Sequence, residues 1–232
     1  MSLSVRSKQE ELMDSPVTSA ADYEQCLSDL EKVNRLTLTH RPTLRWLARA
    51  MHAIPGTTPV SILDVGYGRG DFLRALHRWG AARCRTLILT GIDLNSRSAA
   101  AARAATAAEM QIEYCVGDVF DCTPRPRPDF IVSSQFAHHL DDAQVLEFVR
   151  WMEANCTRGW YVADLQRHAI SHFAFPFIAR IAGWHNIVRD DGTVSIARSF
   201  HIAEWHEILR QAKVRADVRW HIPFRLGVGR VK

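Results

Sequence analysis

The sequence lacks the features that would place a protein in a membrane or outside the cell. Its 232 residues contain no run approaching the roughly 18–20 uninterrupted apolar residues that a membrane span needs. The opening residues, MSLSVRSKQEELMDS, contain no apolar segment of the kind found in secretory signals. We therefore expect a cytoplasmic protein with no stable insertion into a membrane.

Cysteine is scarce, and its spacing excludes two common structural roles. The chain has five cysteines, an odd number, which are widely separated and include no Cys-x-x-Cys pair. Such spacing is typical neither of a disulfide framework nor of a zinc site, so we expect a reducing compartment and no bound metal. The five residues are Cys26, Cys84, Cys115, Cys122 and Cys156.

A strong excess of one charge is also missing. The formal net charge is only +4, from 29 basic and 25 acidic residues. Arginines are interspersed with acids along the chain instead of forming a stripe, so the charge pattern does not indicate a nucleic-acid partner. The composition, 47% hydrophobic and 23% charged, is that of an ordinary folded protein that can bury one sizeable core.

Hydrophobic periodicity divides the chain into an N-terminal part and a larger main domain. Residues 1–20 are polar and mixed in charge, which indicates a frayed arm. Residues 21–51 have helical periodicity, which Pro42 divides into two helices, and a stretch of turn formers follows. We therefore expect an arm and a helical cap over residues 1–52 and one domain over residues 53–232.

The main domain alternates short apolar runs with longer helical segments. This alternation is typical of parallel strands joined by crossover helices. Asp141 followed three residues later by Gln144 predicts a capped helix start. Only Pro223 and Phe224 separate the last two strands, which predicts an antiparallel hairpin at the sheet edge. The expected strands are 60–65, 86–92, 112–116, 130–133, 160–164, 218–222 and 225–231, and the expected helices are 71–79, 96–108, 142–155 and 203–212.

The strongest functional signal is a glycine-rich turn, DVGYGRGD, at residues 64–71. It joins the first buried strand to the following helix, and glycine is needed where a backbone must approach a ligand closely or adopt positive φ. A dinucleotide-binding turn has the spacing GxGxxG, whose third glycine would stand at position 71. That position is Asp71, an acid that would repel a pyrophosphate, which argues against a nicotinamide oxidoreductase.

The spacing DxGxGxG instead resembles that of class I S-adenosylmethionine (SAM)-dependent methyltransferases, in particular the small-molecule enzymes of the type 11 and type 12 groups. The resemblance continues in register, because Asp93 closes the second strand and Gly117-Asp118-Val119 follows the third. It implies SAM as cofactor and a Rossmann-like α/β fold. The expected sheet is doubly wound, seven-stranded and mostly parallel with an antiparallel last strand, with N-terminal helices and a helical lid insertion at about residues 167–198.

The resemblance also implies which residues contact the cofactor. The carboxylate of Asp93 would accept hydrogen bonds from the ribose hydroxyls. Asp64 would either contact the ligand or order the glycine loop, and Arg41 would pair with the methionine carboxylate unless it is a surface arginine. The full expected set is Asp64, Gly66, Tyr67, Gly68, Gly70, Asp93, Leu94, Gly117, Asp118, Val119, Gln135 and Arg41.

The loop after the fourth strand contains a histidine pair, His138 and His139, in the run FAHHLDD. In open α/β sheets ligands bind beyond the carboxyl ends of the strands, and histidine can take a proton from a hydroxyl at neutral pH. The two rings are therefore candidate catalytic groups; the alternative is that they pack under and cap the next helix. The Asp/Asn-Pro-Pro-aromatic motif of enzymes that methylate nucleobase amines is missing from this loop, which argues against a nucleic-acid substrate.

The insertion after the fifth strand is rich in aromatic residues, which favours an apolar or aromatic acceptor. Its expected substrate contacts are Phe173, Phe177, Trp184 and His168. Core packing, a homodimer contact and a membrane-surface helix are the alternatives. We expect O-methylation of a small, partly apolar or aromatic metabolite in quinone-like or natural-product biosynthesis. C- or N-methylation, or a non-catalytic subunit that retains the SAM-binding fold, remain open.

Overall fold

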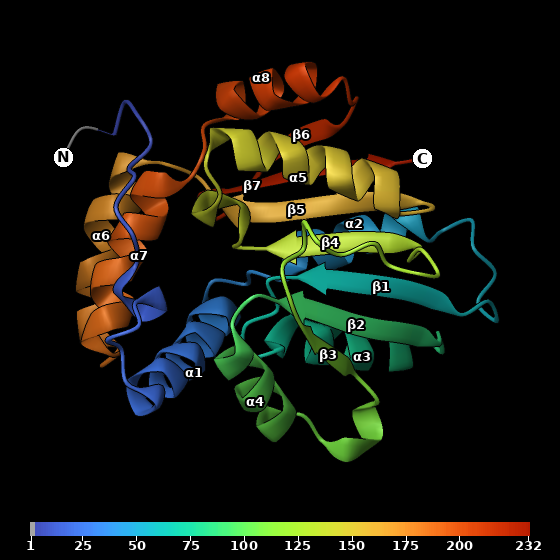
Figure 1. The fold of residues 1–232 in the computed structure, drawn as a ribbon, viewed down its shortest axis with the longest axis horizontal. Coiled ribbons are helices and arrows are strands. Elements are labelled where there is room, and N and C mark those ends of the chain that lie inside the picture. The colour runs from blue at the N-terminus through green and yellow to red at the C-terminus, as the bar shows by residue number, and fades with distance from the viewer. Residues whose placement is uncertain (1–2) are drawn as a thin grey trace.

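In the computed structural model, which describes residues 3–232, one seven-stranded sheet runs through the molecule in the order β3-β2-β1-β4-β5-β7-β6 (Figure 1). Strands β1 to β5 pair in parallel, and β7 pairs antiparallel with both β5 and β6. The expected fold is therefore confirmed. The strands are β1 Val60–Val65, β2 Leu87–Asp93, β3 Glu113–Val116, β4 Phe130–Ser134, β5 Gly159–Leu165, β6 Asp217–His221 and β7 Arg225–Val231.

The last two strands form the expected antiparallel hairpin at the sheet edge. Within it β7 lies between β5 and β6, so that β6 is the edge strand. The burial pattern explains the order: Leu226 and Val228 of β7 are almost fully buried, whereas Trp220 of β6 is half exposed. The more apolar strand, β7, is the one that pairs with a neighbour on both sides, and the more exposed strand, β6, has a neighbour on one side only.

Helices cover both faces of the sheet. On one face lie α2 Arg41–Ala50, α3 Asp71–Ala81 and α4 Ser96–Ala105; on the other lie α5 Asp142–Asn155 and α8 Ile202–Ala212. Short 3-10 turns follow α4 (η2 Ala108–Met110) and β4 (η3 Ala137–His139).

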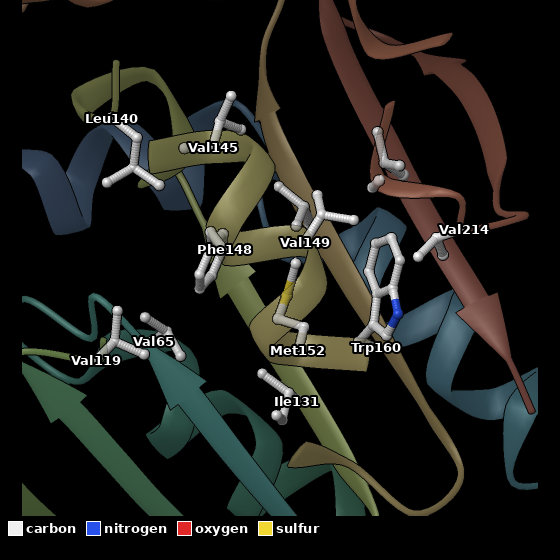
Figure 2. Packing of buried hydrophobic residues seen from close by; sticks show 14 of the residues in the cluster. Val65, Val119, Ile131, Leu140, Val145, Phe148, Val149, Met152, Trp160 and Val214 are labelled. Carbon is white, nitrogen blue, oxygen red and sulfur yellow. The ribbon is translucent and has the colours of Figure 1, made fainter. Parts of the chain in front are cut away.

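Alternate residues of the central strands supply the two cores. Ile62 and Phe130 face α2, α3 and α4, whereas Val65 and Ile131 face α5. Figure 2 shows Phe148 and neighbouring side chains of α5 in the second core, close to Ile131 of the sheet. Strands buried on both faces explain why β1 reads as a nearly continuous apolar run.

The helix starts follow the predicted signals. Pro42 stands in the first turn of α2, after α1 (Ala20–Leu36) has ended, so it divides the N-terminal helical stretch as expected. Asp141 accepts hydrogen bonds from the backbone N–H groups of Ala143 and Gln144, and the Gln144 side chain accepts one from the N–H of Asp141. The capping box predicted for α5 is thus confirmed.

Within residues 3–20 the N-terminal arm is not frayed, contrary to the expectation for residues 1–20, of which residues 1–2 lie outside the part that the structure describes. From Ser7 onward it lies along the insertion helices α6 Ala169–Ile181 and α7 Asn186–Arg198 (Figure 1). The Ser7 N–H donates to the Ala197 carbonyl, and the turn η1 Leu12–Asp14 begins where Asp191 accepts two backbone N–H groups at 2.8 Å. Polar residues of the arm, which the sequence alone would leave in solvent, find hydrogen-bond partners on α7, far away along the chain. Within residues 3–232 no helix combines the length and apolarity needed to cross a membrane.

We expect Asp141→Ala to lower the free energy of unfolding by about 1 kcal/mol, because two backbone N–H groups at the start of α5 lose their acceptor. Urea denaturation measures the change. Glu147→Ala, at an exposed position in the middle of the same helix, is the matched control and should be close to neutral. Equal losses in the two variants would contradict the capping role.

Candidate functional site

A cavity of about 730 Å³ opens at the carboxyl ends of the parallel strands. It lies where the strand order reverses between β1 and β4, the switch point at which open α/β sheets bind ligands. Elements far apart in the chain contribute to its wall, including the N-terminal arm and α1. The predicted site residues that line it are Asp64, Gly66, Tyr67, Gly68, Asp93, Leu94, Gly117, Asp118, Val119, Gln135, His138 and His139.

The glycine turn forms the floor of this cavity. Gly66 and Gly68 have φ of 75° and 53°, values that favour glycine. A Cβ on Gly66 would lie 2.8 Å from the Phe136 ring, whereas a Cβ on Gly68 would meet only Leu27, at 3.7 Å. The backbone at Gly68 therefore lies open to a ligand. Gly70, the N-cap of α3, does not line the cavity.

Asp93 links the turn to the neighbouring strand. One carboxylate oxygen accepts the Gly68 N–H and the other accepts the Asn95 N–H, both at 2.9 Å. Burial raises the pKa of this carboxyl, and the two N–H bonds oppose the shift. Because a carboxylate oxygen can accept more than one hydrogen bond, each retains capacity toward a diol in the cavity.

Asp64, at the base of the turn, is buried, and burial raises its pKa well above the usual range, helped by the charges of Asp71 and Asp93. Its Oδ1 has no hydrogen-bond partner among residues 3–232. It makes no hydrogen bond to the glycine loop within that part of the chain, so the loop-ordering alternative lacks support. Asp64 is among the residues that line the cavity, although this oxygen itself is buried.

Tyr67 turns its ring away from the ligand space. The side chain is 3% exposed, stacks at a tilt on Tyr114 with 5.0 Å between ring centroids, and leaves no room for a Cβ at Gly91. Tyr67 therefore belongs to the core beneath the turn, and only its place in the turn brings it to the cavity wall.

A polar network that includes the predicted residue Gln135 lines the cavity beside α1 and α2. Asp71 accepts hydrogen bonds from the Asn34 side chain at 3.0 Å and from His40 Nε2 at 2.9 Å, and Gln135 donates to Asn34 at 2.5 Å. Burial alone would raise the pKa of Asp71, but these two donors lower it below its usual range, so the carboxylate is ionised at neutral pH. The guanidinium of Arg225 donates to Gln135 from behind.

The structure does not bring Arg41 to the cavity. Arg41 is exposed at the start of α2, and the preceding residue, His40, occupies the wall instead. Arg69 from the glycine turn does line the cavity and pairs with Glu31 of α1 at 3.0 Å. The periodicity of apolar residues does not show which of two adjacent polar residues, His40 or Arg41, faces the cavity. The choice matters because side chains of neighbouring helical residues point about 100° apart.

The histidine pair also lines the cavity. His138 is buried, with Nδ1 2.7 Å from Asp164 Oδ1 and Nε2 3.5 Å from Glu11 Oε1. Burial alone would lower the pKa of His138, but the two carboxylates raise it to about 10. His139 is the more exposed ring, 3.5 Å from Asp14, and burial with the neighbouring His138 lowers its pKa. With this pKa His138 already carries both ring protons at neutral pH, so of the two only His139 retains the properties of a base.

Glu11 and Asp14 are site residues that the sequence did not indicate. Both come from the arm, and Glu11 also accepts a hydrogen bond from Ser195 of α7 at 2.7 Å. Burial alone would raise the pKa of Glu11, but His139 and His138 lower it to about 2. No local motif surrounds Glu11, and only contacts across the fold could have revealed it.

None of the four predicted substrate residues of the insertion lines the cavity. Phe173 and Phe177 are 73% and 69% exposed on the outer side of α6. His168 caps α6 and stacks on Phe224, and Trp184 packs beside Phe175. The insertion packs against α1 through its other side. The N-terminal arm, and not the aromatic residues of the insertion, contributes to the cavity wall through Glu11, Met13 and Asp14.

Comparison with known proteins agrees with this arrangement. Residues 62–159, which include the glycine turn, Asp93 and the histidine pair, match the model of a family described as a methyltransferase domain. This segment of the chain is therefore similar to a methyltransferase domain. The cofactor of such domains is SAM, and the glycine turn and Asp93 fit it.

Curated relatives of the methyltransferase domain include two trans-aconitate 2-methyltransferases. The protein from Mycobacterium tuberculosis (strain ATCC 25177 / H37Ra) is 28% identical over 132 residues, which cover 56% of this chain and 46% of that protein. The protein from Mycolicibacterium gilvum (strain PYR-GCK) is 29% identical over 135 residues, 57% of this chain and 49% of that one. The match thus spans about half the length of these relatives.

Solved structures show the same fold at low identity. The plantazolicin methyltransferase BpumL, in complex with a pentazolic desmethylPZN analog and SAH, superposes with a TM-score of 0.68 at 13% identity and covers 91% of each chain. Human N-acetylserotonin methyltransferase in complex with SAM gives 0.63 at 15% identity, over 92% of this chain and 56% of that one.

Proposed function

We propose that this chain is a SAM-dependent O-methyltransferase of a small, partly apolar acceptor that carries a hydroxyl group. The observation that supports this most directly is a single cavity with two chemically different groups of lining residues. One group is the open glycine backbone with Asp93, and the other, which we call the acceptor end, is His139 beside Glu11. Such a cavity can hold a nucleoside cofactor and a second molecule in contact with each other.

SAM supplies a methyl group already activated on a sulfonium. The chain's own residues have to hold and align the reactants and exclude water. Asp93 would bind the ribose hydroxyls with its remaining lone pairs, while Leu94 and Val119 border the adenine. Asp64, whose Oδ1 has no partner among residues 3–232, would act from the base of the glycine turn.

The acceptor end favours a neutral molecule. Glu11, whose pKa is about 2, and His138, whose pKa is about 10, are oppositely charged at neutral pH and lie 3.5 Å apart, so this pair offers no uncompensated charge to a carboxylate substrate. We therefore do not carry over aconitate from the relatives. Phe120, Phe136 and Leu140 give the cavity apolar wall residues, which suit a phenol or an isoprenoid-like alcohol of quinone or natural-product synthesis.

We expect Asp93→Ala and Gly68→Val to abolish stabilisation by SAM while the fold is retained. At a hundredfold excess over Kd, a ligand stabilises a protein by about 2.7 kcal/mol, or roughly 5–10 °C for a chain of this size. Differential scanning fluorimetry with SAM measures the shift, and circular dichroism checks the fold. Asp121→Ala, an exposed neighbour outside the cavity wall, is the control and should respond to SAM as the wild type does. Unchanged stabilisation in both cavity variants would defeat the cofactor assignment.

We expect His139→Ala to slow methyl transfer at least ~10-fold without weakening SAM binding, because the acceptor hydroxyl loses its polar partner. The acceptor comes from a screen of phenols, quinol precursors and fatty or polyketide alcohols that follows formation of S-adenosylhomocysteine. His206→Ala, which removes an exposed histidine of α8, is the matched control. A wild-type rate in His139→Ala would remove this ring from the mechanism.

A further inference from the structure

The acceptor end of the cavity contains three side chains that could bind the same ion. Glu11, His138 and His139 each offer one ligand atom, and these atoms lie within 4.8 Å of one another. They come from the arm and from η3, and all three residues border the cavity. The cysteine spacing suggested no bound metal, but that pattern carries no information about a site built from histidine and glutamate.

The separation between His138 and Glu11 fits a bridging ion better than a direct hydrogen bond. His138 Nε2 and Glu11 Oε1 are 3.5 Å apart. A charged hydrogen bond between nitrogen and oxygen is usually about 2.7–2.9 Å long. A tetrahedral zinc ion with bonds of about 2.0–2.2 Å places neighbouring ligands about 3.4 Å apart.

A second set of contacts orients these ligands. Asp164 is fully buried, lies 2.7 Å from His138 Nδ1 and accepts the His138 backbone N–H at 2.9 Å, so Nε2 is left to face the cavity. Ser195 donates to Glu11 Oε1 at 2.7 Å. A carboxylate behind a ligating imidazole is the usual arrangement around protein-bound zinc, where it fixes the ring orientation.

The nearby carboxylates and the fixed position of the histidine-bearing turn also favour a metal ion at this site. Glu11, Asp14 and Asp164 place three carboxylates around the two imidazoles. The Arg198 guanidinium lies close by, and it is engaged with the backbone carbonyls of both histidines at 3.0 and 2.7 Å. The histidine-bearing turn is thus held in place by α7 while its rings remain directed toward the carboxylates.

We propose that Glu11, His138 and His139 bind one divalent transition-metal ion of the zinc type. The ion would displace the proton from His138 Nε2, because a ligating imidazole must be neutral. Two imidazoles and one carboxylate are a ligand set that leaves a fourth position open, and here that position faces the cavity. The role of the open position rests on the proposed function: the hydroxyl of the acceptor would coordinate there beside the cofactor. Metal binding itself does not depend on that role.

The test is metal binding by the full chain after treatment with a chelator. Titration with Co²⁺ should give the visible absorption of four-coordinate cobalt at one equivalent, and Zn²⁺ should displace it; calorimetry gives the Zn²⁺ affinity. Glu11→Gln and His139→Ala should each weaken binding at least ~10-fold. Glu10→Gln and His206→Ala, exposed residues of the same types, are the matched controls and should bind as the wild type does.

SAM-induced stabilisation, measured on the same samples, separates this proposal from the proposed function. Asp93→Ala should lose the response to SAM and keep the cobalt spectrum, while Glu11→Gln should do the reverse. A wild-type chain that binds neither ion, or a Glu11→Gln chain as tight as Glu10→Gln, would overturn the metal site and leave the cofactor assignment intact. Loss of SAM stabilisation in the wild type would overturn the proposed function alone.

Discussion

The hydrogen bond from the Gly68 amide to the Asp93 carboxylate connects the turn after β1 with the end of β2. The donor stands at a residue with positive φ, which favours glycine, and the acceptor is the buried carboxylate of Asp93. The bond keeps the turn lying across the carboxyl edge of the sheet, so the strands end at an open cavity and not at a packed loop. Everything the cavity can hold lies between this edge and the segments that cover it.

The acceptor end depends in a similar way on a buried ion pair. Asp164 lies near the end of β5 and is fully buried. An unpaired charge at such a position would strongly destabilise the fold. His138 and its own backbone N–H satisfy that carboxylate, which in turn fixes the direction of the imidazole. Glu11 then approaches the other side of the ring, so the arm is held at the site by electrostatic attraction as well as by its contacts with α7.

The cofactor half of the site could be predicted because it is a local property of the chain. DVGYGRGD and Asp93 each stand at the end of a strand, and parallel strands bring those ends to one edge. The acceptor half could not be predicted in this way. Phe173 and Phe177 suggested a substrate pocket because they are aromatic, but both lie exposed on the outer side of α6. Composition alone does not show which way a helical side chain points.

The sequence by itself determined the strands, most helix starts, the parallel α/β class and the glycine turn, because hydrophobic periodicity, capping residues and backbone freedom act over a few neighbouring residues. Only the tertiary structure decided that β7 lies inside β6, that His40 and not Arg41 reaches the cavity, and that Glu11 meets the histidine pair. These outcomes depend on which surfaces are buried against each other across long stretches of chain. A polar arm has no periodicity that reveals its partner, and burial against a distant helix converts it from a solvated tail into the wall of a site.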